Sequence, residues 1–230
     1  MRIDKCLAHL GYGTRKDVKK IIRSGIVSIN GVICTKEDFK FDEENDELSI
    51  DGVNVLYSKY VYIMLNKPQG VISATEDGLH ETVLNCIQDS TKGLFPVGRL
   101  DIDTEGLCLI SNDGQLAHDL LSPKKHVAKT YYVEISNPLT SEHIKLLESG
   151  ITIDGDELCK PANVKILTDN SLELTIMEGK FHQVKRMMIA CDSEVTYLKR
   201  LTIGSLVLDS ELELGEWRYL TDQELESLKQ

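Results

Sequence analysis

The chain has 230 residues, 41% of them hydrophobic and 27% charged, which is an ordinary balance for a soluble globular protein with one large domain or two unequal ones. No apolar run approaches the roughly 20 residues that span a bilayer, and the first residues lack the apolar core of a secretory signal, so we expect a cytoplasmic protein that neither spans a membrane nor is exported. The formal net charge of −11, taken alone, argues against a nucleic-acid partner.

Positive charge is nevertheless concentrated in short stretches. Residues 1–24 hold seven Lys and Arg residues against two acids, a net charge of +5, and residues 180–200 hold five against two, a net charge of +3. The stretch 124–129 has three lysines and no acid, while acidic residues gather at 37–51 and 209–226. Because charges are screened over about 8 Å at physiological salt, these basic stretches can bind a polyanion despite the acidic total.

The first 24 residues are predicted to form two short helices. Apolar residues at helical spacing indicate a helix over residues 3–10, which Gly11 and Gly13 end. Thr14 is a candidate N-cap for a second helix over residues 15–24, whose surface carries most of the local positive charge.

Two turn pairs follow these helices. Asn30-Gly31, between β-branched residues, predicts a hairpin over 26–33, and Asp51-Gly52 predicts a second hairpin over 47–56. Residues 1–57 are therefore expected to form a small α+β domain, which presents a surface and is too small for a deep pocket. We expect the junction to the rest of the chain at Ser58-Lys59.

The remainder, residues 60–230, is predicted to be rich in strands with a few helices. The predicted strands are 60–65, 106–111, 131–135, 162–167, 171–177, 194–203 and 206–208. The predicted helices are 115–121, 141–149 and 182–190. This mixture favours an α+β fold over a doubly wound α/β fold.

The first candidate for chemistry is the segment from Gly98 to Leu107, which reads GRLDIDTEGL. Its three acids lie within five residues and repel one another, which indicates a function. Asp101 and Asp103 would share a face if the segment were extended. A polar turn, a weak metal site and a glycosidase-type carboxylate pair are all compatible with these residues.

The second candidate is the helix start from Glu178 to Met188, which reads EGKFHQVKRMM. His182 and Lys185 lie three residues apart and so occupy neighbouring parts of one helix face. Cations are unfavourable at a helix N-terminus, which suggests that these charges serve a ligand. A solvated helix face is the alternative.

The third candidate is the segment from Lys129 to Glu134. In a strand, Lys129, Tyr131 and Val133 would share one face. Tyr131 could stack on a nucleic-acid base there, or it could belong to the core.

In this order, the segments resemble the RsuA-type pseudouridine synthases over essentially the whole chain. The N-terminal part of the resemblance is to S4 RNA-binding domains and rests on Arg2-x-Asp4-Lys5, Gly13-Thr14-Arg15-Lys16 and Asn30-Gly31. The segment GRLDIDTEGL is similar to the catalytic motif of the superfamily. The accompanying motifs, in order, are Lys67-Pro68-x-Gly70, Ser111-Asn112-Asp113-Gly114, Lys129-x-Tyr131 and HQVKRM at 182–187.

The resemblance implies an α+β protein of two domains. An S4-like α+β domain would occupy residues 1–57, and a catalytic domain of the pseudouridine synthase fold would occupy residues 60–230. The catalytic domain is expected to have a mixed, largely antiparallel β-sheet with flanking helices.

The resemblance also implies roles for single residues. Asp101 corresponds to the catalytic aspartate, and Lys185 to the basic residue that pairs with it. Tyr131 corresponds to the tyrosine that stacks on the target base. Arg99 corresponds to an arginine that fills the gap left by the flipped nucleotide. Asp103 has no chemistry assigned by the resemblance, and we interpret it as structural support.

RNA is expected to contact a further set of basic residues, namely Arg2, Arg15, Lys16, Lys19, Lys20, Arg23, Lys67 and Arg186. The reaction involves no redox step or group transfer, so neither a cofactor nor a metal is expected. The six cysteines contain no Cys-x-x-Cys pair and are expected to be reduced thiols.

The substrate is indicated by the same resemblance. The form HQVKRM is similar to the enzymes that act on 16S ribosomal RNA, of the type that modifies uridine 516, whereas large-subunit relatives tend to carry an arginine-rich RQIRRM form. The expected partner is 16S rRNA or a partly assembled small subunit, bound by a monomer. The alternatives are a synthase acting on 23S rRNA and a catalytically silent S4-type RNA-binding protein.

Overall fold

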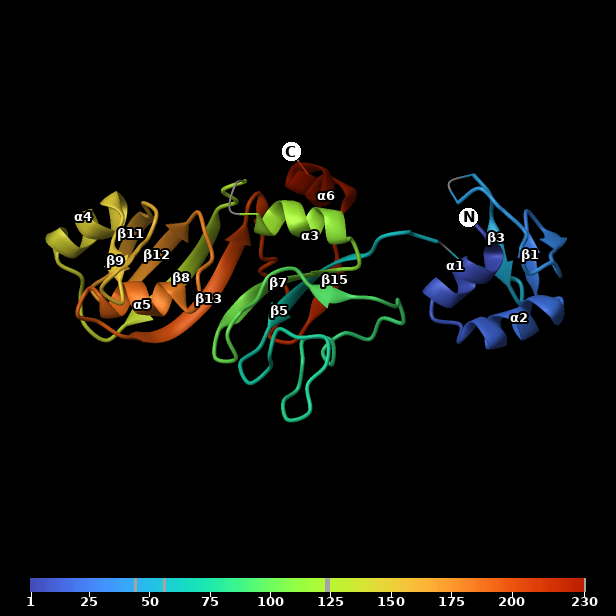
Figure 1. Ribbon diagram of the computed structural model, residues 1–230, viewed down its shortest axis with the longest axis horizontal. Coiled ribbons are helices and arrows are strands. Elements are labelled where there is room, and N and C mark those ends of the chain that lie inside the picture. The colour runs from blue at the N-terminus through green and yellow to red at the C-terminus, as the bar shows by residue number, and fades with distance from the viewer. Residues whose placement is uncertain (44, 56, 123–124, 230) are drawn as a thin grey trace. The chain divides into compact units, whose positions relative to one another are not determined.

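The computed structural model describes residues 1–43, 45–55, 57–122 and 125–229 (Figure 1). Leu56, at the end of the second predicted hairpin, and Lys124, in the basic stretch, lie outside the described residues. The chain divides into two compact units. The first comprises Met1–Val61 with Gln88–Leu94, and the second comprises Tyr62–Ile87 with Phe95–Gln230. The chain therefore passes from one unit to the other three times.

The first unit contains two helices, α1 (Ile3–His9) and α2 (Arg15–Arg23). Thr14 caps α2 as predicted, because its hydroxyl accepts from the amide of Asp17 while the Asp17 carboxylate accepts from the amide of Thr14. The apolar side of each helix faces a core that includes Ile3, Leu7, Val18 and Ile22. The charged residues of α2 are left on the outside.

The two predicted hairpins form a four-stranded sheet in the first unit, in the order β2-β1-β3-β4. Its strands are β1 (Val27–Ile29), β2 (Val32–Ile33), β3 (Leu48–Ile50) and β4 (Val53–Asn54). Both turns have two successive residues with positive φ, at 49° and 76° for Asn30 and Gly31 and at 51° and 76° for Asp51 and Gly52. This is the type I′ geometry that the turn pairs predict.

The second unit is built on a nine-stranded sheet in the order β11-β12-β8-β13-β7-β5-β15, with β14 paired to β13 and β6 paired to β7. Only the β13–β7 pair is parallel among the described strands. The bounds are β5 (Tyr62–Lys67), β6 (Phe95–Pro96), β7 (Glu105–Ser111), β8 (Lys129–Ile135), β11 (Asn163–Thr168), β12 (Ser171–Ile176), β13 (Val195–Ile203), β14 (Leu206–Val207) and β15 (Trp217–Tyr219). The expected α+β class, with a mixed and mainly antiparallel sheet, is confirmed.

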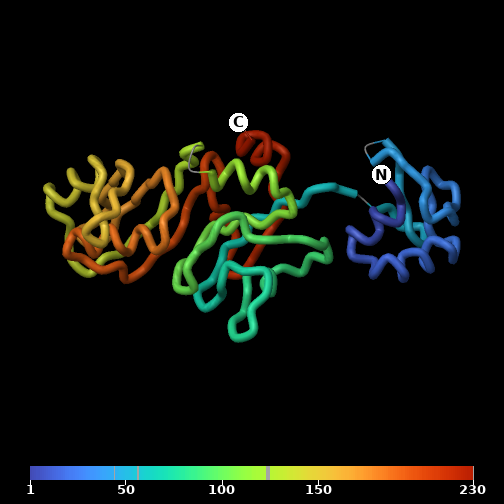
Figure 2. Tube along the Cα trace, viewed as in Figure 1, coloured from blue at the N-terminus to red at the C-terminus, as the bar shows by residue number. Residues whose placement is uncertain are grey.

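Four helices and a small hairpin flank this sheet. The helices are α3 (Gly114–Leu121), α4 (Ser141–Ser149), α5 (Gln183–Ile189) and α6 (Asp222–Lys229), and the hairpin joins β9 (Thr152–Ile153) to β10 (Glu157–Leu158). Helices α3 and α6 share a core with β5 and β7 through residues such as Leu116, Leu120 and Leu228, and Figure 2 traces the chain through this unit. Strand β7 is buried along its whole length, so it lies at the centre of the unit.

In the part of the chain that the structure describes, no helix has the length and apolarity needed to cross a bilayer.

Candidate active site

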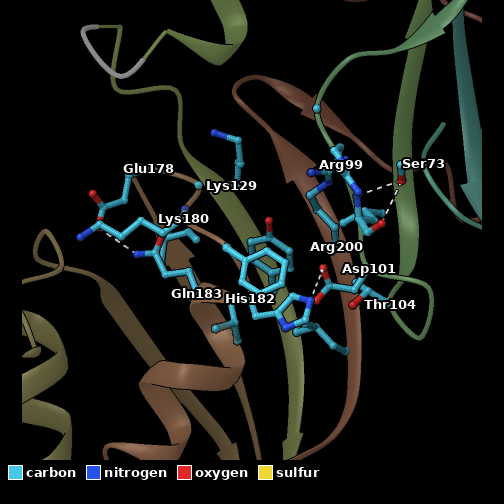
Figure 3. A pocket seen from close by; sticks show the side chains of 18 of the residues that line it. Ser73, Arg99, Asp101, Thr104, Lys129, Glu178, Lys180, His182, Gln183 and Arg200 are labelled. Atoms are coloured by element: carbon cyan, nitrogen blue, oxygen red, sulfur yellow. Dashed lines mark hydrogen bonds and ion pairs between the residues drawn. The ribbon is translucent and has the colours of Figure 1, made fainter. Parts of the chain in front are cut away.

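A cavity of about 650 Å³ lies in the second unit, at the face of the sheet where β8 and β13 pair. Its walls come from the loop at 98–104 that leads into β7, from the turn at 177–182 that leads into α5, and from α5 itself. All three sequence candidates therefore line one cavity (Figure 3).

Asp101 lies on a tight turn in this cavity. The amide of Thr104 donates to the carbonyl of Asp101 at 3.1 Å, which closes a turn over residues 101–104. The segment is not extended here, because residues 102 and 103 form a turn, so the shared strand face considered for Asp101 and Asp103 does not arise. The turn brings both carboxylates to the ammonium of Lys185.

The loop that carries Asp101 is held by two buried side chains. The hydroxyl of Ser73 both donates to the carbonyl and accepts from the amide of Leu100, each at 2.9 Å. The ammonium of Lys67 donates to the carbonyls of Thr104 at 2.8 Å and Pro68 at 3.0 Å. Lys67 is fully buried, and this burial lowers its pKa. Its side chain therefore supports the loop that carries Asp101. The expectation that Lys67 contacts RNA was wrong for this structure, because the side chain is fully buried.

Lys185 joins the two carboxylates. Its ammonium lies 3.2 Å from Oδ2 of Asp101 and 2.6 Å from Oδ1 of Asp103. Burial lowers the pKa of Lys185, but the hydrogen bonds to Asp103 and Asp101 outweigh it and leave the pKa raised. Burial raises the pKa of Asp103, and the bond from Lys185 reverses this and leaves the pKa lowered. Lys185 is thus held in its charged form beside Asp101.

His182 provides the second contact to Asp101. Its Nε2 lies 3.4 Å from Oδ1 of Asp101 (Figure 3), whereas Lys185 contacts Oδ2, the other carboxylate oxygen. Sequence reasoning noted that His182 and Lys185 share a helix face, but it gave His182 no role. Asp101 is about a quarter exposed, so its carboxylate remains open to the cavity.

Tyr131 forms part of the sheet face that floors the cavity. It lies opposite Arg200 of β13 and Leu174 of β12. Tyr131 is 8% exposed and Arg200 is 2% exposed, with Nε of Arg200 donating to the carbonyl of Leu107 at 2.8 Å. Lys129 lies on the same strand face, and burial followed by the charge of Arg200 lowers its pKa. Arg200 has no obvious sequence signal, because its burial depends on the pairing of distant strands.

Arg99 and Arg186 differ in their surroundings. Arg99 is exposed at the cavity, and among the described residues its guanidinium has no hydrogen bond or ion pair. Arg186 donates at 2.5 Å to Glu157 and at 2.7 Å to Asp154, and its Nη1 donates to the carbonyl of Phe181 at 2.9 Å. Arg99 is therefore available to a ligand, whereas Arg186 is engaged in holding the turn before α5.

A second candidate surface is the basic side of α2. Arg15, Lys16 and Lys20 are exposed and have no ion pair among the described residues. Lys19 and Arg23 instead both pair with Glu37, and the hydrogen bond from Lys19 lowers the pKa of this carboxylate. Arg2 likewise pairs with Asp4 at 2.7 Å. The unpaired charge of this helix thus belongs to three residues.

No group of three or more His, Cys, Asp or Glu residues with a geometry suited to a metal ion is found among the described residues.

Comparisons with known proteins cover both units. Residues 61–190 match the family described as RNA pseudouridylate synthase, and residues 1–48 match the S4 domain. The chain is 47% identical to the uncharacterized RNA pseudouridine synthase YtzG of Bacillus subtilis, covering 100% of this chain and 99% of the relative. It is 38% identical to the ribosomal small subunit pseudouridine synthase A of Escherichia coli, covering 99% and 100%. A crystal structure of a pseudouridylate synthase matches with a TM-score of 0.70 at 39% identity, covering 99% of both chains.

Proposed function

The chain belongs to the RNA pseudouridylate synthase family, and we propose that it isomerises one uridine of 16S ribosomal RNA to pseudouridine with Asp101 as the catalytic carboxylate. The observation that carries the assignment of Asp101 is its position in the cavity, where Lys185 and His182 each contact one of its carboxylate oxygens. A carboxylate must be ionised to act as a nucleophile or base, and a neighbouring ammonium favours that form.

The reaction conserves every atom of the nucleotide. The bond between N1 and C1′ breaks, the uracil turns, and a bond between C5 and C1′ forms. The proton that leaves C5 is balanced by one that N1 gains. The enzyme must therefore supply a group that assists bond cleavage and proton transfer, and a site that holds the detached base. Asp101 supplies the first, and the cavity above the sheet supplies the second.

The target uridine must leave its stack to enter this cavity. Tyr131 lies on the cavity floor, where its ring can pack against the uracil. Arg99 is exposed at the cavity without a partner among the described residues, so it can occupy the gap that the extruded nucleotide leaves. These two roles follow the family resemblance, and the positions of both side chains support them.

The substrate assignment rests on the relatives. Several full-length relatives at 38–40% identity carry the name ribosomal small subunit pseudouridine synthase A. We assign the same substrate class to this chain, either as 16S rRNA or as a partly assembled small subunit, with uridine 516 as the target. The alternative target is 23S rRNA, and the alternative outside enzymes is a catalytically silent RNA-binding protein.

The test compares wild type with Asp101→Asn. Both proteins are incubated with unmodified 16S and 23S rRNA, each free and partly assembled, and pseudouridine is mapped by carbodiimide-dependent reverse-transcription stops. We expect one new stop in 16S rRNA with wild type and none with Asp101→Asn, because the amide cannot act as a base or anionic nucleophile. A stop only in 23S rRNA overturns the substrate, and RNA binding without any stop favours the silent binding protein.

A further inference from the structure

Phe181 is an aromatic residue held in solvent at the edge of the catalytic cavity. It is 76% exposed although it lines the cavity, and its ring stacks on His182 with centroids 3.8 Å apart and planes 19° apart. A large apolar side chain gains nothing from this exposure in the free protein. We propose that Phe181 is a stacking site for an RNA base that flanks the target uridine. This proposal rests on the proposed function.

The turn that carries Phe181 is held by hydrogen bonds with Gln183 and Arg186. Gln183 is almost fully buried, and its side-chain oxygen accepts from the amide of Lys180 while its nitrogen donates to Glu178, each at 2.9 Å. The carbonyl of Phe181 accepts from Arg186 at 2.9 Å. Arg186 is in turn bound by Asp154 and Glu157. The exposure of Phe181 is therefore a property of an ordered turn and not of a loose loop.

The backbone next to Phe181 is strained. His182 has φ 48° and ψ 34°, the left-handed conformation that residues other than glycine rarely adopt. Its side chain makes no capping hydrogen bond to α5. Strain of this kind persists where the surrounding structure imposes it, often at functional sites. This backbone conformation orients the imidazole of His182 so that its face stacks on Phe181 and its Nε2 contacts the carboxylate of Asp101.

The ring of Phe181 stacks on His182, and His182 contacts Asp101. Only one side chain therefore lies between the exposed ring and the proposed catalytic carboxylate. A nucleotide that flips into the cavity leaves its neighbours without a stacking partner. An aromatic ring held beside the entrance can replace that partner for the next base along the strand, because stacking on an aromatic ring tolerates any base. Tyr131 on the cavity floor is assigned to the target uracil, which leaves Phe181 for a flanking base.

The charges near the ring suit RNA as the occupant. Arg99 is exposed, and Lys129 and Lys185 line the same cavity. Single-stranded RNA is typically bound by such cations together with stacking rings.

The first experiment is a kinetic comparison of Phe181→Ala, Phe181→Tyr and Ile189→Ala on 16S rRNA. Ile189 is the control because it is also exposed, at 62%, and ends α5, the helix that follows Phe181, without lining the cavity. We expect KM to rise on the order of tenfold for Phe181→Ala, because the variant loses the binding free energy of one stacked base. The change in kcat should be smaller. Phe181→Tyr and Ile189→Ala should behave like wild type. Equal KM values for Phe181→Ala and wild type would overturn the proposal.

The second experiment reads binding directly and does not depend on turnover. The chain contains one tryptophan, Trp217, so Phe181→Trp adds a single emitter at the proposed site. A short single-stranded oligoribonucleotide should quench the added emission through stacking while leaving the emission of wild type nearly unchanged. Binding without quenching of the added tryptophan overturns the stacking site. Failure of the proposed function has a different signature, since wild type would then form no pseudouridine in any rRNA.

Discussion

At the scale of single residues, an unusual feature is Lys67, a fully buried lysine that has no carboxylate partner among the described residues. Lys67 donates to the carbonyls of Pro68 and Thr104, and these bonds offset the cost of burying its charge. Thr104 closes the turn on Asp101, so the ammonium holds the backbone of the loop that carries Asp101. The lowered pKa of Lys67 reflects the cost of burial.

Replacing this lysine should weaken both the fold and the site. Lys67→Met leaves the carbonyl of Thr104 without its donor, so we expect the free energy of unfolding to fall by about 1–3 kcal/mol and kcat to fall with the loosened turn. Urea denaturation and single-turnover pseudouridine formation measure the two effects. Lys165→Met is the control, because Lys165 is exposed and pairs with Glu173 on the surface, where such pairs contribute little. The same small loss in both variants would contradict the role of Lys67.

The proposed catalytic residues came from the resemblance, but the sequence did not indicate which side chains support them. Asp101 and Lys185 are 84 positions apart, and only the folded unit brings their charges within 3.2 Å. The burial of Lys67 and Arg200 depends on strand pairing that no local pattern reports. Phe181 and His182 lie in the predicted basic helix start, but the sequence did not predict the left-handed backbone of His182 or the stacking of the two rings.

At the scale of elements, α2 carries two groups of basic residues, one bound in ion pairs and one without ion pairs among the described residues. Lys19 and Arg23 are bound to Glu37, whereas Arg15, Lys16 and Lys20 are unpaired among the described residues. Only the unpaired charges can replace counterions on phosphates without first breaking an ion pair. The contribution of this helix to RNA binding should therefore come mainly from these three residues.

This division can be tested by neutralising the two sets separately. We expect Arg15→Gln, Lys16→Gln and Lys20→Gln together to weaken RNA binding and to reduce the slope of log K against log salt by about 2. The paired set, Lys19→Gln with Arg23→Gln, should change the slope less. Fluorescence anisotropy over a range of salt concentrations measures both. An unchanged slope in the triple variant would remove α2 from the RNA contact.

Elements with strong local signals were predicted well. Both hairpins follow from their turn pairs, and α2 follows from its capping residue, because these signals depend on neighbours in sequence. The elements that were missed are β6, β9, β10, β15 and α6. Strands β6, β9 and β10 have only two residues each, and β15 and α6 lie within or beside an acidic stretch. That stretch is ordered by Arg218, which binds Asp209 and Glu224.

At the scale of the whole molecule, the chain returns to the first unit after it has entered the second. Residues 88–94 pack with the first unit, where the amide of Lys92 donates to the carbonyl of His9 at 3.3 Å and the hydroxyl of Ser90 donates to the carbonyl of Leu10 at 3.1 Å. Gly11 permits this packing, because a Cβ there would lie 2.5 Å from the carbonyl oxygen of Ser90.

A substitution at Gly11 should therefore release the returning segment. Gly11→Ala places a side chain at φ +87° and against Ser90, whereas Gly52→Ala has a similar φ of +76° with no atom within 4 Å. Both variants should lose about 1 kcal/mol or more from the left-handed backbone, and only Gly11→Ala should lose the packing as well. Hydrogen exchange of the Lys92 amide is the measurement. Equal protection of Lys92 in the two variants would show that the close approach at Gly11 is unimportant.

The three passages of the chain between the units also bear on how such a protein can be rearranged by recombination. A domain joined by one linker can be gained, lost or exchanged through a single genetic breakpoint. Here a breakpoint near residue 60 would leave residues 88–94 behind, and this segment includes Leu94, which is buried in the intact protein. A graft of another RNA-binding domain would have to replace two separate segments at once. The catalytic unit and its RNA-binding unit are thus expected to be inherited as one piece.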